Sequence, residues 1–385
     1  MRRWLLRLLV VLPVLVIAGL FAVPPLVDRA LNRVLDVPHA PLSEAGRALH
    51  AKLQVADMHA DPLLWKRDLT ERIDHGHVDI PRLIEGNVAL QVFSAPTQVP
   101  LGLNYDANEL RQDMVTSLAI FQGWPRDTWH SPLQRALYMS AELHRAAERS
   151  QGAFRVIEDA PGLARYLTDR RSNPRLTAGM LSIEGMHAIE GNLDNIEVLR
   201  RAGFRMMGLA HFFDNALTGS AHGMEKGGLT DLGRQAIARM ESSGILVDLA
   251  HTSPRAIDDA LKVATRPLVV SHVGLKGTCD TIRNLSDDQA RAIAKTGGVI
   301  GIGYWDAAVC DVSVRGVARA IQYGIELVGA DAIGLGSDFD GATHTPFDTA
   351  GLALITDELL RMGVSESDIR KVMGGNVIRV LAGQL

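Results

Sequence analysis

The chain has 385 residues, of which 47% are hydrophobic and 22% are charged, and its formal net charge at pH 7 is −4. This length accommodates one large domain or two ordinary ones, and the composition is that of a globular protein with a sizeable core. Because the net charge is slightly negative and the sequence contains no basic block, the composition argues against a nucleic acid as a partner.

The first 27 residues differ in composition from the rest. Arg2, Arg3 and Arg7 precede an uncharged apolar stretch over residues 8–27, which just reaches the length of about 20 residues that a membrane-spanning helix needs. No clean small-x-small cleavage site follows, so we favour an uncleaved anchor over a cleaved signal peptide. Arginines on the leading side predict a cytoplasmic N-terminus and a body exported across the inner membrane, in the periplasm or outside the cell. The predicted division is an n-region at 1–7, a transmembrane anchor at 8–27, a linker at 28–41 and a folded domain at 42–385.

Within this domain, short apolar runs alternate with helical patterns. Residues 43–50 predict a capped helix, and residues 107–170 are mainly helical in pattern. Eight strand-like runs end at Asp61, Phe93, Glu184, His211, His251, His272, Tyr304 and Asp338. Strands and helices in alternation predict a parallel sheet, and eight units predict an α/β fold of the (β/α)8 TIM-barrel type. An open doubly wound sheet is the alternative, but the glycine-rich phosphate loop expected after its first strand is absent from the sequence.

The first strand ends in Asp57-Met58-His59-Ala60-Asp61. Side chains two positions apart on a strand point to the same face, so Asp57, His59 and Asp61 are predicted to converge. Two carboxylates around an imidazole form half of a site for a divalent metal. Such a pattern alone is more often a solvated strand end, but later strands supply further ligand-type residues at the same end of the predicted barrel.

Five of these side chains are imidazoles or carboxylates of the kind that zinc accepts, namely His59, Asp61, Glu184, His251 and His272. Five protein ligands exceed what one catalytic zinc normally takes, and a carboxylate can bridge two ions. The set therefore predicts a binuclear site with two Zn²⁺ per chain that activates a bridging water as hydroxide.

Together these residues give the sequence a resemblance to the membrane (renal) dipeptidase family, zinc-dependent peptidases with a barrel of the metal-dependent amidohydrolase type. The resemblance runs from about Leu53 to Leu381. Its motifs are Asp57-Met58-His59-Ala60-Asp61, Ser182-Ile183-Glu184-Gly185-Met186-His187, Leu209-Ala210-His211 with Asn215, Gly228-Leu229-Thr230-Asp231-Leu232-Gly233, Asp248-Leu249-Ala250-His251, Ser271-His272, Arg283-Asn284, Gly336-Ser337-Asp338-Phe339-Asp340-Gly341 and Gly374-Gly375-Asn376. Met58 and Ala60 stand where the family commonly has Gly and Asn, and we expect this departure to alter packing or substrate fit rather than zinc binding.

The resemblance implies a role for each residue of the site. His59 and Asp61 would hold one zinc, His251 and His272 the other, and Glu184 would bridge the two. His211 is similar to a substrate-contacting histidine that stabilises the oxyanion, and Arg283 to an arginine that engages the terminal carboxylate of the substrate. Asp338 resembles the aspartate that takes a proton from the attacking water and passes it to the leaving amine.

The chain contains two cysteines, Cys279 and Cys310. In an exported protein an even pair predicts a disulfide, whereas two free buried thiols would be expected in a cytosolic one. The resemblance favours the bridge, because the mammalian members of the family carry a disulfide at these positions.

The sequence therefore predicts a membrane-anchored zinc dipeptidase that hydrolyses the peptide bond of small dipeptides, including those with a D residue at the C-terminal position. One alternative is another hydrolase of the same barrel superfamily, acting on N-acyl amino acids, lactones or phosphoesters; a bridging carboxylated lysine would favour it, whereas Glu184 fits the dipeptidase. A non-catalytic binding protein on the same barrel is the other alternative, and the presence of every ligand and of Asp338 counts against it. Members of the family tend to form homodimers, and the sequence leaves the oligomeric state open.

Overall fold

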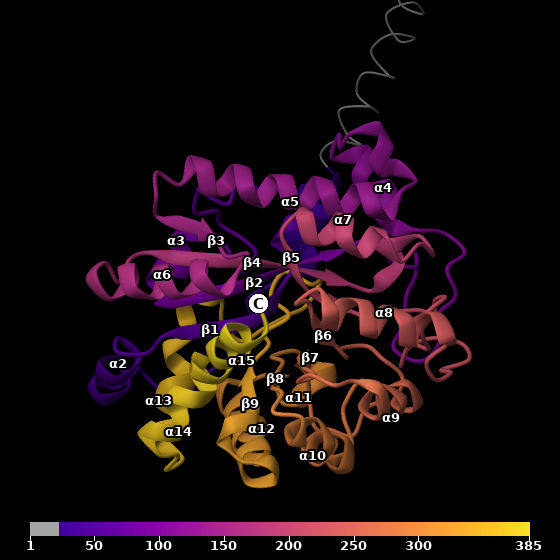
Figure 1. The fold of residues 1–385 in the computed structure, drawn as a ribbon. Helices are drawn as coiled ribbons and strands as arrows, with labels where there is room; N and C mark the ends of the chain where they lie inside the picture. Colours follow the sequence, from indigo (N-terminus) through magenta and orange to yellow (C-terminus); the bar gives the residue numbers. More distant parts are fainter. Residues whose placement is uncertain (1–22) are drawn as a thin grey trace, which may run out of the picture.

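The computed structural model describes residues 23–385, in which a parallel sheet is surrounded by helices (Figure 1). Nine strands lie in this part of the chain: β1 (Val55–Ala60), β2 (Val88–Pro96), β3 (Phe154–Val156), β4 (Thr177–Glu184), β5 (Phe204–Gly208), β6 (Leu246–Asp248), β7 (Val270–Val273), β8 (Ile300–Ile302) and β9 (Ile333–Leu335). Eight of them follow the order β6-β5-β4-β2-β1-β9-β8-β7, and β3 pairs with the first residues of β4.

Backbone hydrogen bonds close this order into a ring. The two end strands meet where Leu249 N donates to Val269 O at 2.9 Å and Val269 N donates to Val247 O at 3.1 Å. Neighbouring strands are parallel throughout the described sheet. The predicted α/β fold with a parallel eight-stranded sheet is confirmed, and its arrangement is consistent with a TIM barrel. The short strand β3 falls inside residues 107–170, which the sequence pattern predicts to be mainly helical.

The helices follow the strands along the chain. The α-helices are α2 (Glu44–His50), α3 (Ile80–Glu85), α4 (Met114–Phe121), α5 (Pro132–Arg149), α6 (Ala160–Ser172), α7 (Asn195–Arg201), α8 (Asp231–Ser242), α9 (Pro254–Val263), α10 (Asp287–Lys295), α11 (Asp306–Val309), α12 (Val314–Val328), α13 (Ala353–Arg361), α14 (Glu366–Arg370) and α15 (Asn376–Gln384). Short 3₁₀ turns lie at Pro62–Leu64, Arg126–Trp129, Met186–Ile189, Ala330–Ala332 and Thr349–Gly351, and a π turn lies at Lys371–Gly375.

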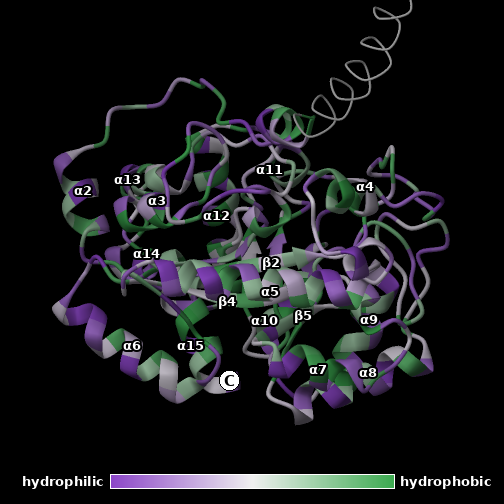
Figure 2. Ribbon diagram, turned by 90° about the horizontal axis from the view of Figure 1, so that it is seen from above, coloured by the Kyte–Doolittle hydropathy of each residue, from purple (hydrophilic) through white to green (hydrophobic). Residues whose placement is uncertain are grey.

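Local sequence explains where the helices begin and which face they bury. Ser286 Oγ accepts a hydrogen bond from Gln289 N at the start of α10, and Ser253 precedes Pro254, the first residue of α9. A hydroxyl at the cap satisfies a free N–H of the first turn, and proline at the first helical position has no N–H to satisfy. Ala136, Met139 and Leu143 recur at helical spacing on the buried face of α5, and Figure 2 shows polar and apolar faces on this helix.

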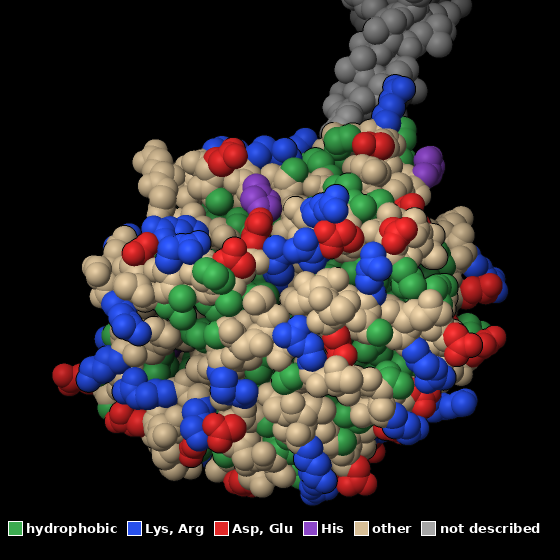
Figure 3. Space-filling model, viewed as in Figure 1, with side chains coloured by type: hydrophobic (Ala, Val, Ile, Leu, Met, Phe, Trp, Pro, Cys, Tyr) green, Lys and Arg blue, Asp and Glu red, His purple; other side chains and the backbone are tan. Residues whose placement is uncertain are grey.

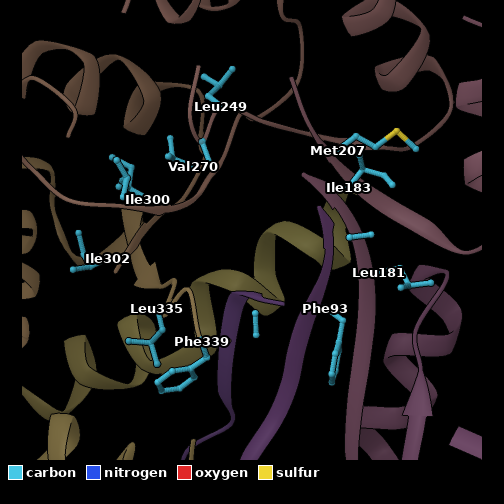
Figure 4. Packing of buried hydrophobic residues seen from close by; sticks show 14 of the residues in the cluster. Phe93, Leu181, Ile183, Met207, Leu249, Val270, Ile300, Ile302, Leu335 and Phe339 are labelled. Carbon is cyan, nitrogen blue, oxygen red and sulfur yellow. The ribbon is translucent and has the colours of Figure 1, made fainter. Parts of the chain in front are cut away.

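Two apolar layers hold the barrel together. The larger lies between strands and helices and includes Leu181, Ile183 and Met207, which belong to neighbouring strands (Figure 4). The smaller joins Met58 and other strand residues to Val377 and further residues of α15. The segment before α15 closes the amino-terminal end of the strands, since a Cβ on Gly374 would lie 2.0 Å from Gln54 O, just before β1. The opposite, carboxyl-terminal end is thus left for polar groups. Charged groups of both signs are interspersed on the face of residues 23–385 that Figure 3 shows.

The predicted membrane location has to be corrected. Residues 8–22 of the predicted anchor lie outside the described part of the chain, and residues 23–27 belong to a helical segment over 23–31. In this segment Asp28 is 3% exposed and forms an ion pair with Arg67 of the barrel. Within residues 23–385, no helix combines the length and apolar character needed to cross a bilayer. The placement of the protein as a single-pass protein of the inner membrane, with the barrel on its outer side, is therefore withdrawn. The predicted boundaries at residues 7, 27 and 41 stay predictions.

The predicted disulfide is present. It joins Cys279, in the segment that follows β7, to Cys310, which ends α11, across 31 residues of sequence. Both segments lie beside the carboxyl-terminal end of the barrel, and the loop enclosed by the bridge contains Arg283 and Trp305.

We predict that replacing both cysteines by alanine lowers the free energy of unfolding by about 3 kcal/mol, because a cross-link over a loop of this length restricts the unfolded chain. Equilibrium unfolding in urea, with the wild-type protein compared in the presence and absence of reductant, measures the change. A double variant as stable as the oxidised wild type would contradict the prediction.

Candidate active site

Seven polar side chains meet at the carboxyl-terminal end of the barrel. They come from the ends of β1, β4, β5, β6, β7 and β9, and they are His59, Asp61, Glu184, His211, His251, His272 and Asp338. Each is at most 8% exposed. Because parallel strands place their carboxyl ends at one face of a barrel, residues separated by almost three hundred positions become neighbours here.

Glu184 lies at the centre of this cluster. Its Oε1 atom is 3.1 Å from His251 Nε2, 3.3 Å from His272 Nε2 and 3.6 Å from His59 Nε2. The Nε2 atoms of His251 and His272 are themselves 3.0 Å apart. One carboxylate oxygen therefore faces three imidazole nitrogens.

These separations fit the edges of a metal coordination shell. With ligand bonds of about 2.0–2.1 Å, neighbouring ligand atoms of a tetrahedral zinc site lie about 3.3 Å apart. His59 Nε2 and Asp61 Oδ1 are buried and have no hydrogen-bond partner within residues 23–385. The donor atoms form overlapping groups, which are His59 with Glu184 and His272, Glu184 with His211 and His251, and His59 with Asp61 and Asp338. The residues thus fit a metal centre, and Glu184 belongs to two of its groups.

The electrostatics of the cluster favour bound positive charge. Burial raises the pKa of Glu184 well above its usual range, and repulsion from Asp61 adds to the effect. Burial and the same neighbour raise the pKa of Asp338 to about 8, against the opposing influence of His59. Burial disfavours the charged form of His59, but Asp61 and Glu184 outweigh it and raise the pKa of His59 to about 10. Three ionised carboxyl groups packed this closely repel one another, and a bound divalent cation offsets this repulsion.

Ser271 and Asp248 fix the orientation of His272. Ser271 Oγ donates to Asp248 Oδ2 at 2.5 Å, so its oxygen accepts the Nδ1–H of His272 at 2.8 Å. Asp248 is held in turn by the backbone N–H groups of Ala250 and Ser271 at 3.0 and 2.8 Å. With its proton on Nδ1, His272 presents the Nε2 lone pair to the cluster. The sequence places Asp248 and Ser271 within ligand motifs, but it assigns neither a role.

Asp57 does not join the cluster, contrary to the strand alternation. The pairing of β1 with β2 is irregular between Asp57 and Ala60, so the regular two-residue period does not carry through to His59. The Asp57 carboxylate instead accepts hydrogen bonds from the backbone N–H groups of His59 and Ser337 and from Gln91 Nε2. It therefore ties β1 to its neighbours rather than serving as a ligand.

His211 touches both the cluster and the adjoining cavity. Its Nδ1 is 3.3 Å from Gln98 O, to which it donates, and its Nε2 is 3.4 Å from Glu184 Oε2. Burial lowers the pKa of His211 well below its usual range. The position suits the substrate contact predicted from the sequence, and it also places Nε2 in a ligand group with Glu184 and His251.

A cavity of about 300 Å³ opens over the cluster. Its polar lining includes Glu184, His211, Asp338 and Arg283, and its apolar walls include Trp65, Tyr105, Phe212 and Trp305. Composition and periodicity do not predict these aromatic walls, because the four residues lie in the connections between strands and helices.

Arg283 is a buried cation in the wall of this cavity. Its Nη2 donates to His272 O at 2.7 Å, and its guanidinium carbon lies 5.5 Å from the centre of the Trp305 ring. The Nε group has no partner within the described residues. Burial lowers the pKa of Arg283, against the opposing charges of Asp338 and Glu184. The Nε–H group of Arg283 is therefore available to bind an anionic ligand.

Asp338 is held on a tight loop after β9. Its carbonyl accepts hydrogen bonds from Thr343 Oγ1 at 2.6 Å and from Gly341 N at 3.2 Å. A Cβ on Gly341 would lie 2.1 Å from Asp338 Oδ1 and 2.9 Å from Asp61 Oδ2, so a larger residue here would displace these carboxylates.

Comparison with known proteins agrees with this geometry. The family model "Membrane dipeptidase (Peptidase family M19)" matches residues 43–384. Dipeptidase aclJ of Aspergillus oryzae is 29% identical over 352 residues, which cover 86% of this chain and 78% of that protein.

Two solved structures share the fold. A metallopeptidase from Rhodobacter sphaeroides, liganded with a phosphinate mimic of the dipeptide L-Ala-D-Ala, is 24% identical, with a TM-score of 0.72 over 86% of this chain and 99% of its own. The probable dipeptidase PvdM from Pseudomonas aeruginosa is 17% identical, with a TM-score of 0.74 over 88% of this chain and 97% of its own.

We predict that Ser271→Ala weakens metal binding at least tenfold, because His272 loses the acceptor that fixes its proton on Nδ1. Titration of the metal-free protein with zinc measures the affinity. Ser94→Ala is the matched control, since Ser94 is also buried in the barrel but its hydroxyl has no hydrogen-bond partner in the described chain. Equal affinities for the two variants would rule out this role of Ser271.

Proposed function

This chain belongs to the membrane dipeptidase family, peptidase family M19, a family of metal-dependent hydrolases, and we propose that its barrel holds a binuclear zinc centre that cleaves small dipeptides. The proposed substrates include dipeptides with a D residue at the C-terminal position. The observation that carries the proposal is the position of Glu184, one oxygen of which lies within 3.6 Å of three imidazole nitrogens contributed by separate strands.

The ligands divide between two ions. His59 and Asp61 would hold one zinc and His251 and His272 the other, with Glu184 between them. Two distances support this division: Asp61 Oδ2 is 3.4 Å from His59 Nε2, and the Nε2 atoms of His251 and His272 are 3.0 Å apart. When bound, the zinc ions supply Lewis acidity and lower the pKa of a water molecule so that it becomes a nucleophile near neutral pH.

Arg283 selects the substrate class. A guanidinium offers a fork of donors that matches a carboxylate, and Arg283 is buried at 4% exposure with donors to spare. We infer that the free α-carboxylate of the substrate reaches Arg283 while the peptide bond to be cleaved lies over Glu184. In that position only one residue follows the cleaved bond. The aromatic walls at Tyr105, Phe212 and Trp305 would accept its side chains.

Asp338 and His211 would act on the reacting atoms. Asp338 would take a proton from the attacking water and deliver it to the leaving amine, a role that its place in the cavity lining, 3.8 Å from His59 Nε2, supports. His211 would stabilise the oxyanion by donating from Nε2, which requires its proton to move to Nε2 from Nδ1, the nitrogen that donates to Gln98 O in this structure. Both side chains line the cavity.

A protein with the same fold supports the proposal that a D residue is accepted at the C-terminal position. The Rhodobacter sphaeroides metallopeptidase with the same fold was solved with a mimic of L-Ala-D-Ala. A dipeptide panel therefore has to vary the configuration of both residues.

We expect the purified protein to contain about two zinc ions per chain and to hydrolyse L,L and L,D dipeptides, and we expect a chelator to abolish hydrolysis until zinc is returned. Metal analysis and release of free amino acids measure these outcomes. N-acyl amino acids, lactones and phosphoesters in the same panel test for the other hydrolases of the barrel superfamily. A zinc-loaded protein that leaves every dipeptide intact would refute the proposed substrate class.

Replacement of Asp338 by Asn is expected to lower kcat by at least about a hundredfold while zinc content is retained, because the amide cannot accept and return the proton. The control is Asp331→Asn, which changes an exposed carboxylate in the turn that precedes β9. Steady-state hydrolysis and metal analysis are measured for both variants. If Asp338→Asn retains a kcat within a fewfold of the wild-type value, Asp338 is not the group that transfers the proton.

A further inference from the structure

The loop after β9 has an unusual backbone. Asp338, Asp340 and Ala342 have φ angles of 57°, 63° and 59°, so three alternate residues that are not glycine adopt the left-handed conformation. Such residues each cost free energy and persist only where the surroundings hold them. Gly341, Ala342 and Thr343 of this loop also line the cavity. The loop therefore depends on anchors outside itself.

Asp340 supplies one anchor. Its carboxylate accepts hydrogen bonds from the backbone N–H groups of His77 and Val78 at 2.8 and 3.0 Å, and it forms an ion pair with Arg67 Nη1 at 2.7 Å. Its carbonyl accepts the indole N–H of Trp65 at 2.7 Å. Burial would raise the pKa of Asp340, but the charge of Arg67 and the interaction with the His77 side chain outweigh it and hold this pKa well below its usual range.

Arg67 is shared with the N-terminal segment. Its Nε donates to Asp28 Oδ2 at 2.8 Å, and its Nη2 pairs with Asp28 Oδ1. The side chains of Asp28, Arg67 and Asp340 are 4%, 3% and 0% exposed. A buried cation between two buried carboxylates is costly to disrupt, because removal of one partner leaves charge unpaired.

Asn32 supplies a second, direct anchor. Its Nδ2 donates to Asp28 Oδ1 at 2.8 Å, which fixes the amide, and its Oδ1 accepts the backbone N–H of Ala342 at 2.9 Å. Asn32 is 1% exposed. The next residues continue the contact, since Thr345 N donates to Arg33 O at 3.1 Å and Leu35 N donates to Thr345 O at 2.8 Å.

We propose that residues 28–35, which precede the region matched by the family model, position the loop that carries Asp338. Asn32 acts on Ala342, and Asp28 acts through Arg67 on Asp340, so both are positioning residues rather than groups that touch substrate. The inference rests on the proposed role of Asp338. The five proposed zinc ligands lie outside this loop, so loss of the anchors displaces Asp338 and the cavity wall while the metal centre stays loaded.

The central variant is Asn32→Ala in the full chain. We expect kcat to fall about tenfold, with zinc content at the wild-type level, because small displacements of a reacting group are costly. Amide hydrogen exchange of peptides covering residues 338–345 should quicken, since the Ala342 N–H loses its acceptor. Arg29→Gln is the matched control, because Arg29 lies in the same segment but pairs with Asp74 at the surface, where the side chains are 52% and 75% exposed.

A double-mutant cycle separates positioning from general stability. Glycine adopts positive φ at little cost, so Ala342→Gly removes part of the strain that Asn32 holds. We expect the factor by which Asn32→Ala lowers kcat to be about three times smaller in the Ala342→Gly background than in the wild-type background. Strictly additive effects would overturn the proposal, as would wild-type kcat and wild-type exchange in Asn32→Ala, or loss of zinc in parallel with loss of activity.

The exchange measurement does not depend on the reaction. If the wild-type protein hydrolyses no dipeptide, the proposed function fails, and faster exchange at residues 338–345 in Asn32→Ala still establishes the anchoring. Asp28→Asn, which keeps the shape of the side chain, provides the same readout should Asn32→Ala be recovered in too low a yield. Unchanged exchange in both variants would refute the anchoring whatever the activity.

Discussion

The structure depends on the burial of several carboxylates at one end of a closed sheet. Glu184, Asp61 and Asp338 lie together with three imidazole nitrogens in a region that the solvent barely reaches. Charged groups are tolerated in such a place only when they are paired or coordinate a cation. The remainder of the barrel supplies the conditions for this arrangement, because apolar layers and α15 stabilise the other end of the strands and leave the carboxyl-terminal end free for ligand atoms.

Orientation matters as much as identity at such a site. His272 is directed by Ser271 and Asp248, and the loop of Asp338 is directed by Asp340 and its partners. In both cases a buried carboxylate outside the cluster sets the position of a group within it. The barrel therefore separates two tasks, since one set of acids forms the buried cluster and another set holds the backbone and the imidazole rings in place.

The sequence predicted the eight strands of the barrel and the residues at their ends, because short apolar runs followed by ligand-type residues are a local signal. It failed where the outcome depends on distant contacts. The face of Asp57 follows from an irregular pairing between β1 and β2, and β3 is too short to interrupt the helical pattern around it. The walls at Tyr105 and Phe212 come from loops whose paths the pattern does not determine. The packing of residues 28–35, which lie in the stretch 28–41 predicted as a linker, rests on single pairs such as Asn32 with Ala342, which no periodicity reveals.

The docking of residues 28–35 against the β9 loop bears on how this enzyme is prepared for study. A recombinant version trimmed to the start of the family match at residue 43 would retain every proposed zinc ligand and every strand, and it would pass a test of fold and metal content. It would nevertheless lack Asp28 and Asn32, leaving Arg67 with one buried partner instead of two and the Ala342 N–H without its acceptor. Low activity of such a shortened protein would then result from the truncation and would not be a property of the intact enzyme. Expression should therefore begin upstream of residue 28.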